Sequence, residues 1–405
     1  MNNKLLNLEY GSIHFTYWAV FAAISSFSSV LLLGRGYTNS EIGVIVAISN
    51  ILSVLIQPFT ADLADRSKRI SLVGISQIMT LFMMGLTGLL LIFRGAGPLV
   101  FVIYAVILGV HASLQPLYNS LNFKLEECGA NMNFGMCRCG GSLGYSILCL
   151  ILGSVVKQHG SEVLPGLDLV FMAAIVLTVW LTWLQYEKIR ANNVNVKKEW
   201  EEEKEDINLV DFVRRNGLFF VLNIGVFFLY IHNQVLNIFM LQVVQDVGGD
   251  SVDMGRVLSL MAFLEIPTMF CFDWINRKFS TSFLLKVSAV GFTAKIGLVF
   301  LSRSVTGILL AHILQLVSYA LFLPAMVKYT NEVMSRGEAV KGQSLFTIMA
   351  TVSGIAASFF GGFILDHGGA RMLTGVSTLA AAIGTVILFL TVDRIIEKKK
   401  RGTQL

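Results

Sequence analysis

The sequence predicts an all-α membrane protein with twelve transmembrane helices in two six-helix bundles. Of its 405 residues, 55% are apolar and only 14% are charged, whereas a soluble globular chain carries about 25% charged residues. The mean hydropathy of +0.69 covers the whole length, which argues against one anchoring helix on a large water-soluble domain. Because a span needs about 20 apolar residues, the chain has no room for a separate catalytic domain, and we do not expect an enzyme.

Apolar runs of spanning length fall into two sets of six. The first set lies at about residues 12–33, 41–63, 70–93, 98–122, 137–157 and 164–186. The second set lies at about residues 217–242, 254–275, 282–302, 305–329, 343–365 and 371–393.

The two sets are separated by a hydrophilic linker, in which residues 187–215 hold 15 charged residues in 29. We expect a short amphipathic helix around Leu209–Phe212. The predicted organisation is an N-terminal bundle (1–186), a charged cytoplasmic linker (187–216), a C-terminal bundle (217–395) and a basic tail (396–405).

Positive charges in the short connections predict the orientation of the chain. Arg66, Lys68 and Arg69 follow the second span, seven basic residues lie in the linker, and Arg277 and Lys278 follow the eighth span. Since Lys and Arg resist translocation, we expect both termini in the cytoplasm, in a multi-pass plasma membrane protein. This bias accounts for the net charge of +5 without binding to nucleic acid. The five cysteines suggest neither a disulfide framework nor a metal site.

A charged motif follows the second span. Asp65, Arg66, Lys68 and Arg69 resemble the charged run of G-x-x-x-D-[RK]-x-G-[RK]-[RK], the loop motif of the major facilitator superfamily, and the first glycine is replaced by Ala61. An Asp at a helix end beside basic residues can form a charge-assisted network. This motif therefore predicts a cytoplasmic gate, and the alternative is a simple positive flank.

The segment Asn133–Tyr145 resembles F-G-x-x-R-x-x-G-x-x-G-[WY], the signature of the lactose permease branch of that superfamily. This branch contains oligosaccharide and proton symporters, with nucleoside and aromatic-acid relatives. The resemblance implies the major facilitator fold, a monomer, and transport by rocking of two bundles around a midplane site. It also implies that Arg138 binds the solute and that Tyr145 stacks on it. The alternative for Arg138 is a side chain that snorkels to the cytoplasmic surface.

Glycines and amides around this segment support a packed, polar interior. Glycines at 140, 141 and 144 are expected to let the fifth span pack closely against a neighbour. The fourth span carries four polar side chains on one helical face, which must meet water, ligand or another helix. These four residues are His111, Gln115, Asn119 and Asn122. The acid that the sugar symporters carry on this helix is missing, because Asn119 and Ser120 stand at the nearest positions.

The second half also carries polar side chains inside apolar spans. The solute-binding candidates here are His232, Asn233, Asn237, Gln315 and Tyr319. Asn119, Asn122, Arg138 and Tyr145 are those of the first half.

Proton coupling is expected at Glu265, which the span boundaries make the only carboxylate well inside a span. Lys295 and His232 are its expected partners, because a nearby cation and burial shift the pKa of a carboxylate in opposite directions. The tenth span has Gln315 and Ser318 where the permease has its His and Glu pair. The alternative is a structural ion pair between the eighth and ninth spans.

These observations predict a secondary transporter that imports a sugar or oligosaccharide with protons. The proton would be the coupling ion, with no other cofactor and no metal. A nucleoside or organic-acid symporter is the alternative within the same fold. A non-transporting membrane sensor or scaffold is the alternative of another class, although it gives no reason for embedded charges.

Overall fold

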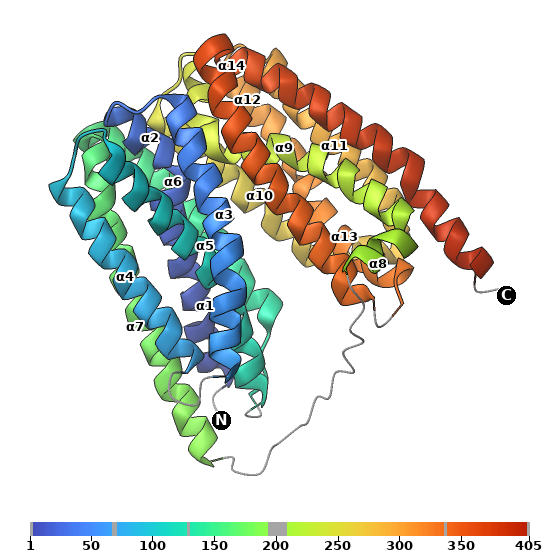
Figure 1. Ribbon diagram of the computed structural model, residues 1–405, viewed down its shortest axis with the longest axis horizontal. Coiled ribbons are helices and arrows are strands. Elements are labelled where there is room, and N and C mark those ends of the chain that lie inside the picture. The colour runs from blue at the N-terminus through green and yellow to red at the C-terminus, as the bar shows by residue number, and fades with distance from the viewer. Residues whose placement is uncertain (1–2, 67–70, 128–129, 193–208, 336–337, 403–405) are drawn as a thin grey trace. The chain divides into compact units, whose positions relative to one another are not determined.

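The computed structural model describes residues 3–66, 71–127, 130–192, 209–335 and 338–402 (Figure 1). Within these ranges every regular element is a helix. The chain divides into two compact units, Met1–Trp200 with Asp250–Ala262, and Glu201–Gly249 with Phe263–Leu405. We call them the N-terminal and the C-terminal unit.

The N-terminal unit is built mainly from long helices, of which α6 packs on α1, α5 on α3, and α7 on α4. Its elements are α1 (Asn3–Phe21), η1 (Ala22–Ser26), α2 (Ser28–Gly34), α3 (Asn39–Arg66), α4 (Leu72–Ile92), α5 (Pro98–Glu127), α6 (Phe134–His159), η2 (Ser161–Val163) and α7 (Leu164–Asn192). Here η1 is a π-helical turn and η2 a 3₁₀ turn.

The C-terminal unit is organised around α9, which runs against α14. Its elements are α8 (Leu209–Arg215), α9 (Gly217–Gln245), α10 (Ser251–Lys278), α11 (Thr281–Leu301), α12 (Val305–His312), η3 (Ile313–Leu316), α13 (Tyr319–Val333) and α14 (Ala339–Gly402). The first turns of α10 belong to the N-terminal unit. The short helix α8 confirms the amphipathic helix expected around Leu209, and its Phe212 is fully buried in the apolar core of the unit.

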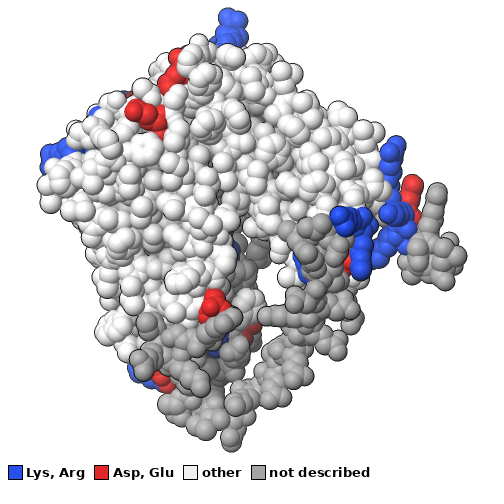
Figure 2. All heavy atoms as spheres, viewed as in Figure 1, with Lys and Arg blue, Asp and Glu red and all other residues white. Residues whose placement is uncertain are grey.

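The predicted fold class, an all-α membrane protein, is confirmed. Among the described residues, 11 helices are long and apolar enough to cross a membrane, and the last of them, Ala339–Lys399, covers two of the predicted spans. Gly369 interrupts that helix with a φ of +71°, a conformation that glycine adopts without a steric penalty. Figure 2 shows that the face in view is uncharged over most of its area, as a lipid-facing surface requires.

Side-chain caps fix where several helices begin. The side chains of Ser71, Asn133, Ser280 and Ser304 accept hydrogen bonds from backbone N–H groups three residues later. Such a bond satisfies one of the N–H groups that a helix start leaves free. Asn133 therefore sets the first turn of α6, which carries Arg138.

A seam of glycines brings α6 against α1, as the sequence predicts. A Cβ at Gly140 would lie 3.0 Å from the Gly11 carbonyl oxygen, and one at Gly144 would lie 2.7 Å from the Phe15 carbonyl oxygen. These distances leave no room for a side chain. The absence of Cβ atoms is therefore what allows the two helices to meet.

Candidate functional site

The C-terminal unit contains a buried amide between a base and an acid. Lys295 on α11 is 0% exposed, and its Nζ donates to Gln315 Oε1 at 2.8 Å. Gln315 Nε2 in turn donates to Glu265 Oε1 on α10 at 2.9 Å. An ammonium only donates and a carboxylate only accepts, so the two charges fix which way the amide points. We call this arrangement the Lys295–Gln315–Glu265 relay.

A break in the tenth span places Gln315 in the relay. Residues Ile313–Leu316 form the 3₁₀ turn η3, and the α-helix resumes only at Tyr319. Gly291 on α11 lets this break come close, because a Cβ there would lie 3.1 Å from the Val317 carbonyl oxygen. The relay thus depends on irregular backbone on one helix and on a missing side chain on another.

Two buried histidines lie near Lys295. His232 Nδ1 is 2.5 Å from the Leu229 carbonyl oxygen, and His312 Nδ1 is 2.7 Å from the Ile308 carbonyl oxygen. A carbonyl only accepts, so each Nδ1 carries a hydrogen, and in the neutral ring each Nε2 keeps a lone pair. Both Nε2 atoms are buried without a hydrogen-bond partner among the described residues, and both rings lie within electrostatic range of Lys295.

His312 is a residue that the sequence analysis missed. The available signal was its position three residues before Gln315 in an otherwise apolar span. The other predicted residues of this half lie on neighbouring elements. Asn233 is buried with its Oδ1 unpartnered among the described residues, Asn237 is half-buried, and the Tyr319 ring centroid lies 6.0 Å from that of Tyr230.

In the N-terminal unit, Arg138 lies over an aromatic side chain of α1. Its guanidinium carbon is 4.8 Å from the Trp18 ring centroid, within the range of a cation–π contact. The Trp18 ring centroid lies 4.9 Å from that of Phe21 and 6.1 Å from that of Tyr145. Tyr145 and Ser26 share a hydrogen bond of 2.8 Å between their hydroxyl oxygens. We call Trp18, Phe21 and Tyr145 the aromatic cluster.

The polar side chains predicted on the fourth span have different neighbours. The His111 ring stacks on Tyr17 with centroids 4.4 Å apart and planes 7° apart. Asn122 Nδ2 donates to Glu126 Oε1 on the same helix at 3.0 Å. Asn119 is half-buried, and its Oδ1 is buried without a partner among the described residues. Asn119 thus has a polar atom that a ligand could bond, as His111 and Asn122 also do at Nε2 and Oδ1.

The predicted gate lies mostly outside the described part of the chain. Asp65 and Arg66 are the last two residues of helix α3, whose backbone is described there. Lys68 and Arg69 lie outside the described residues. The gate network stays a prediction.

The prediction that Glu265 is the only carboxylate deep in a span is wrong. Asp168, near the start of α7, is 2% exposed, and both of its carboxylate oxygens are buried without a hydrogen-bond partner among the described residues. The sequence placed it four residues inside a predicted span, where a side chain usually reaches water. Packing of distant segments around the first turn of α7 buries it instead.

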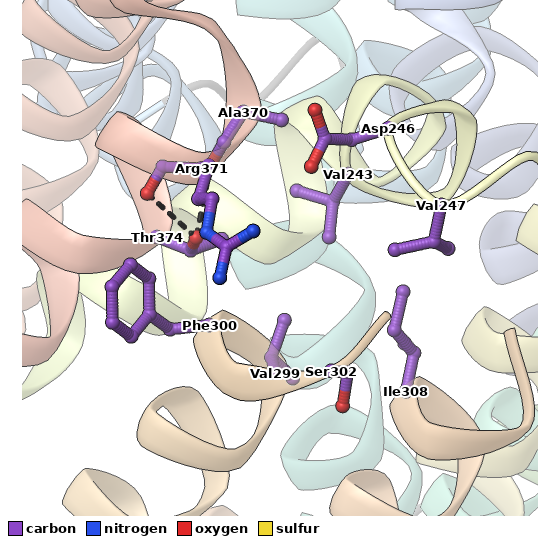
Figure 3. A pocket seen from close by; sticks show the side chains of 10 residues that line it. All are labelled: Val243, Asp246, Val247, Val299, Phe300, Ser302, Ile308, Ala370, Arg371 and Thr374. Atoms are coloured by element: carbon purple, nitrogen blue, oxygen red, sulfur yellow. Dashed lines mark hydrogen bonds between the residues drawn. The ribbon is translucent and has the colours of Figure 1, made fainter. Parts of the chain in front are cut away.

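A small surface hollow lies elsewhere in the C-terminal unit (Figure 3). Thr374 Oγ1 donates to the carbonyl oxygens of Ala370 at 2.9 Å and Arg371 at 3.1 Å, and the guanidinium carbon of Arg371 lies 5.8 Å from the Phe300 ring centroid. The hollow is lined by Val243, Asp246, Val247, Val299, Phe300, Ser302, Ile308, Ala370, Arg371 and Thr374. It shares no residue with the relay. We therefore consider two candidate sites separately, the relay in the C-terminal unit and the aromatic cluster in the N-terminal unit.

Comparison with known families identifies the kind of protein. The model of the MFS_1 like family matches residues 7–373. The chain belongs to this family. It is therefore a multi-pass membrane transporter of the major facilitator superfamily and not an enzyme.

Relatives of this MFS transporter agree with that assignment. It is 23% identical over 380 residues to the uncharacterized transporter YwbF of Bacillus subtilis (strain 168), covering 91% of this chain and 89% of that protein. A crystal structure of the nucleoside transporter NupG aligns with a TM-score of 0.76 and 14% identity, covering 98% and 99% of the two chains. The POT family transporter PepTSo aligns with a TM-score of 0.71 and 11% identity, covering 98% and 99%. At these identities the structural likeness shows the fold alone.

Proposed function

We propose that this MFS transporter imports a neutral, hydroxyl-rich solute, a sugar or oligosaccharide, together with protons. The observation that carries the proposal is the Lys295–Gln315–Glu265 relay. A buried lysine and an embedded carboxylate are costly in a membrane protein, and a scaffold without transport would gain nothing from them. A group that binds and releases a proton does need such a position.

Proton binding at Glu265 would change the whole relay. The Gln315 Nε2 hydrogen bond to Glu265, 2.9 Å long, is charge-assisted only while the carboxylate is ionised, and such bonds are roughly twice as strong as neutral ones. Protonation would weaken it and leave the buried Lys295 without its countercharge. An unpaired buried charge is strongly destabilising, so proton binding favours a rearrangement of the unit.

The aromatic cluster and Arg138 support a ring-shaped polar solute. The apolar faces of a sugar ring pack well against aromatic rings, while its hydroxyls accept from a guanidinium and bond to amides such as Asn119. Arg138 makes no hydrogen bond or ion pair to a side chain that the structure describes. Its donors are therefore available to the solute.

A nucleoside is the second candidate. Its base offers a flat face for the aromatic cluster and its ribose offers hydroxyls, and the fold matches that of the nucleoside transporter NupG. An organic acid is the third, because Arg138 and Lys295 supply positive charge. Plasma membrane localisation, cytoplasmic termini and a monomeric state remain part of this proposal.

Transport by Glu265→Gln in proteoliposomes tests the proposal. The glutamine mimics a permanently protonated carboxyl, so exchange of internal for external labelled solute should persist while uphill uptake driven by a pH gradient disappears. The exposed Glu397 supplies the control variant Glu397→Gln, which should retain both activities. Accumulation that persists in Glu265→Gln excludes Glu265 as the proton carrier. Loss of both activities assigns it to solute binding instead.

The same vesicles identify the solute class. Labelled sugars, nucleosides and organic acids are offered in turn to the wild-type protein with and without the pH gradient. Uptake of sugars alone supports the first candidate, and uptake of nucleosides alone replaces it with the second.

A further inference from the structure

The N-terminal unit contains a second buried carboxylate, Asp168, that the proposed function does not use. It is 2% exposed, and neither oxygen accepts a hydrogen bond from any described residue. An ionised carboxylate in such a place would cost several kcal/mol. The position therefore needs either a countercharge or a proton.

The guanidinium of Arg35 does not supply the countercharge. Arg35 is buried, and its Nε and Nη2 donate to the two carboxylate oxygens of Glu162 at 2.8 and 2.9 Å. Its Nη1 donates to the Phe93 carbonyl oxygen at 3.1 Å, and Nη2 also donates to the Leu90 carbonyl oxygen at 2.7 Å. The charge of Arg35 is thus balanced by Glu162, and its hydrogen bonds hold the end of α4. Asp168 forms no ion pair with a described residue.

The hydroxyl of Tyr104 cannot serve an ionised Asp168. Tyr104 on α5 lies within electrostatic range of both Asp168 and Arg35. Its O–H donates to the Ile24 carbonyl oxygen at 2.7 Å, in the π-helical turn η1. The single hydrogen of Tyr104 is therefore committed, and what remains is a lone pair that can accept from a carboxylic acid but cannot bond to a carboxylate.

The elements packed on α7 add no further cation to this neighbourhood among the described residues. The helix contacts α1, α4, η1 and η2; α4 and η1 have no ionisable side chain, and η2 has only Glu162. Helix α1 meets α7 where the hydroxyl oxygens of Thr16 and Thr178 lie 3.2 Å apart. Asp168 is ten residues before Thr178 on α7, about 15 Å along the helix axis. The ionisable side chains of α1 that the structure describes stand near Thr16 or before it, and they are Glu9, Tyr10, His14 and Tyr17.

From this geometry we propose that Asp168 is a second proton-binding site, which holds its proton in the conformation described here. It is independent of Glu265, which belongs to the other unit. The ligand is the proton itself, bound by a carboxyl that has no cation beside it among the described residues. Each unit would then have a carboxyl that binds a proton, Asp168 in the N-terminal unit and Glu265 in the C-terminal unit.

Labelling with dicyclohexylcarbodiimide tests this in the wild-type protein in proteoliposomes. The apolar reagent reacts with a protonated carboxyl: the acid oxygen bonds to the carbodiimide carbon, its hydrogen moves to one nitrogen, and the acyl group then shifts to nitrogen with nothing leaving. We expect the peptide containing Asp168 to gain this adduct at pH 6, and its labelling to fall at least tenfold at high pH. Asp168→Asn should remove this adduct and leave any adduct on Glu265. Protection by Na⁺ at constant pH would overturn the proposal in favour of a cation site.

Thermal unfolding across pH gives a second test that does not depend on access of the reagent. A carboxyl protonated in the folded chain and ionised in the unfolded chain raises the unfolding constant about tenfold per pH unit above roughly pH 4. The wild-type protein should therefore lose stability as pH rises relative to Asp168→Asn, which mimics the neutral acid. Parallel pH profiles of the two proteins would overturn the proposal. If Asp168→Asn fails to fold, Asp168→Glu should fold and keep the wild-type dependence, and a flat profile in it would also overturn the proposal.

Discussion

Lys295 and Glu265 are connected through the side-chain amide of Gln315, which lies 2.8 Å from the first and 2.9 Å from the second. The amide accepts on one side and donates on the other, so it is oriented by both charges at once. Since an amide does not titrate near neutral pH, it transmits the charge state of its neighbours without carrying the proton. Under the proposed function, the relay would respond to protonation at Glu265 without conducting protons to Lys295.

Replacing Gln315 with leucine should break this connection. We expect Gln315→Leu to reduce pH-driven accumulation at least tenfold and to lower the melting temperature, because the uncompensated buried Lys295 costs about 3–5 kcal/mol. The matched control is Gln77→Leu, which removes a half-buried glutamine whose Nε2 donates to the Val176 carbonyl oxygen at 2.9 Å. The double variant Gln315→Leu/Lys295→Met should regain stability without regaining accumulation. Normal accumulation in Gln315→Leu would show that the relay is only structural.

Arg138→Lys should weaken solute binding by an order of magnitude or more while the protein still folds. Lysine lacks the planar fork that can bond two solute oxygens, and it stacks less well on Trp18. The measurement is ligand-induced thermal stabilisation, with the exposed Arg94→Lys as control. Stabilisation equal to that of the wild type would make Arg138 a side chain that merely snorkels.

The glycine seam between α6 and α1 should be intolerant of a methyl group. Gly144→Ala is expected to destabilise the protein by about 1–3 kcal/mol through overpacking, since its Cβ would meet the Phe15 carbonyl oxygen at 2.7 Å. Gly88→Ala on α4 is the control, because a Cβ there meets nothing within 4 Å. Melting temperatures in detergent compare the two. A neutral Gly144→Ala would mean that α1 and α6 can separate without loss.

The ion pair of Lys157 with Asp250, which precedes α10, predicts how the stability of the protein changes at low pH. The hydrogen bond from Lys157, 2.7 Å long, together with its charge, lowers the pKa of Asp250. A carboxyl with a lowered folded-state pKa adds stability above its unfolded value of about 3.9, and this contribution is lost as pH falls further. The melting-temperature difference between wild type and Asp250→Asn should therefore be small at pH 7, since both side chains are exposed, and should vanish near pH 3. A difference that grows on acidification would contradict this assignment.

Most of the fold follows from run lengths and glycine spacing in the sequence. The apolar runs predicted the spans, and Gly140 and Gly144 predicted the seam because a missing Cβ is visible in any sequence. The π-helical turn at Ala22–Ser26 and the 3₁₀ turn at Ile313–Leu316 could not be predicted in this way. Neither contains Gly or Pro, so their shape comes from tertiary contacts rather than from local preference.

The candidate site was predicted only in part. Glu265, Lys295 and Gln315 were recognisable because each is polar within an apolar run, and the structure brings them together. Asp168 was missed because it stands near a span end, where burial is decided by the elements packed on α7, which are α1, α4, η1 and η2. His312 was missed because nothing in its own segment shows that α11 places a lysine beside it.

The break in the tenth span also has a mechanical consequence. At η3 the i to i+4 ladder gives way to a 3₁₀ turn, where the Leu314 carbonyl oxygen accepts from both Val317 N–H and Ser318 N–H, and Pro324 removes a further donor in α13. A helix bends most easily where its i to i+4 hydrogen bonds are interrupted, and Gln315 lies at that point. Because Gln315 is bonded to Glu265, a change in the charge of Glu265 under the proposed function would act on the tenth span at the point where that helix bends most easily.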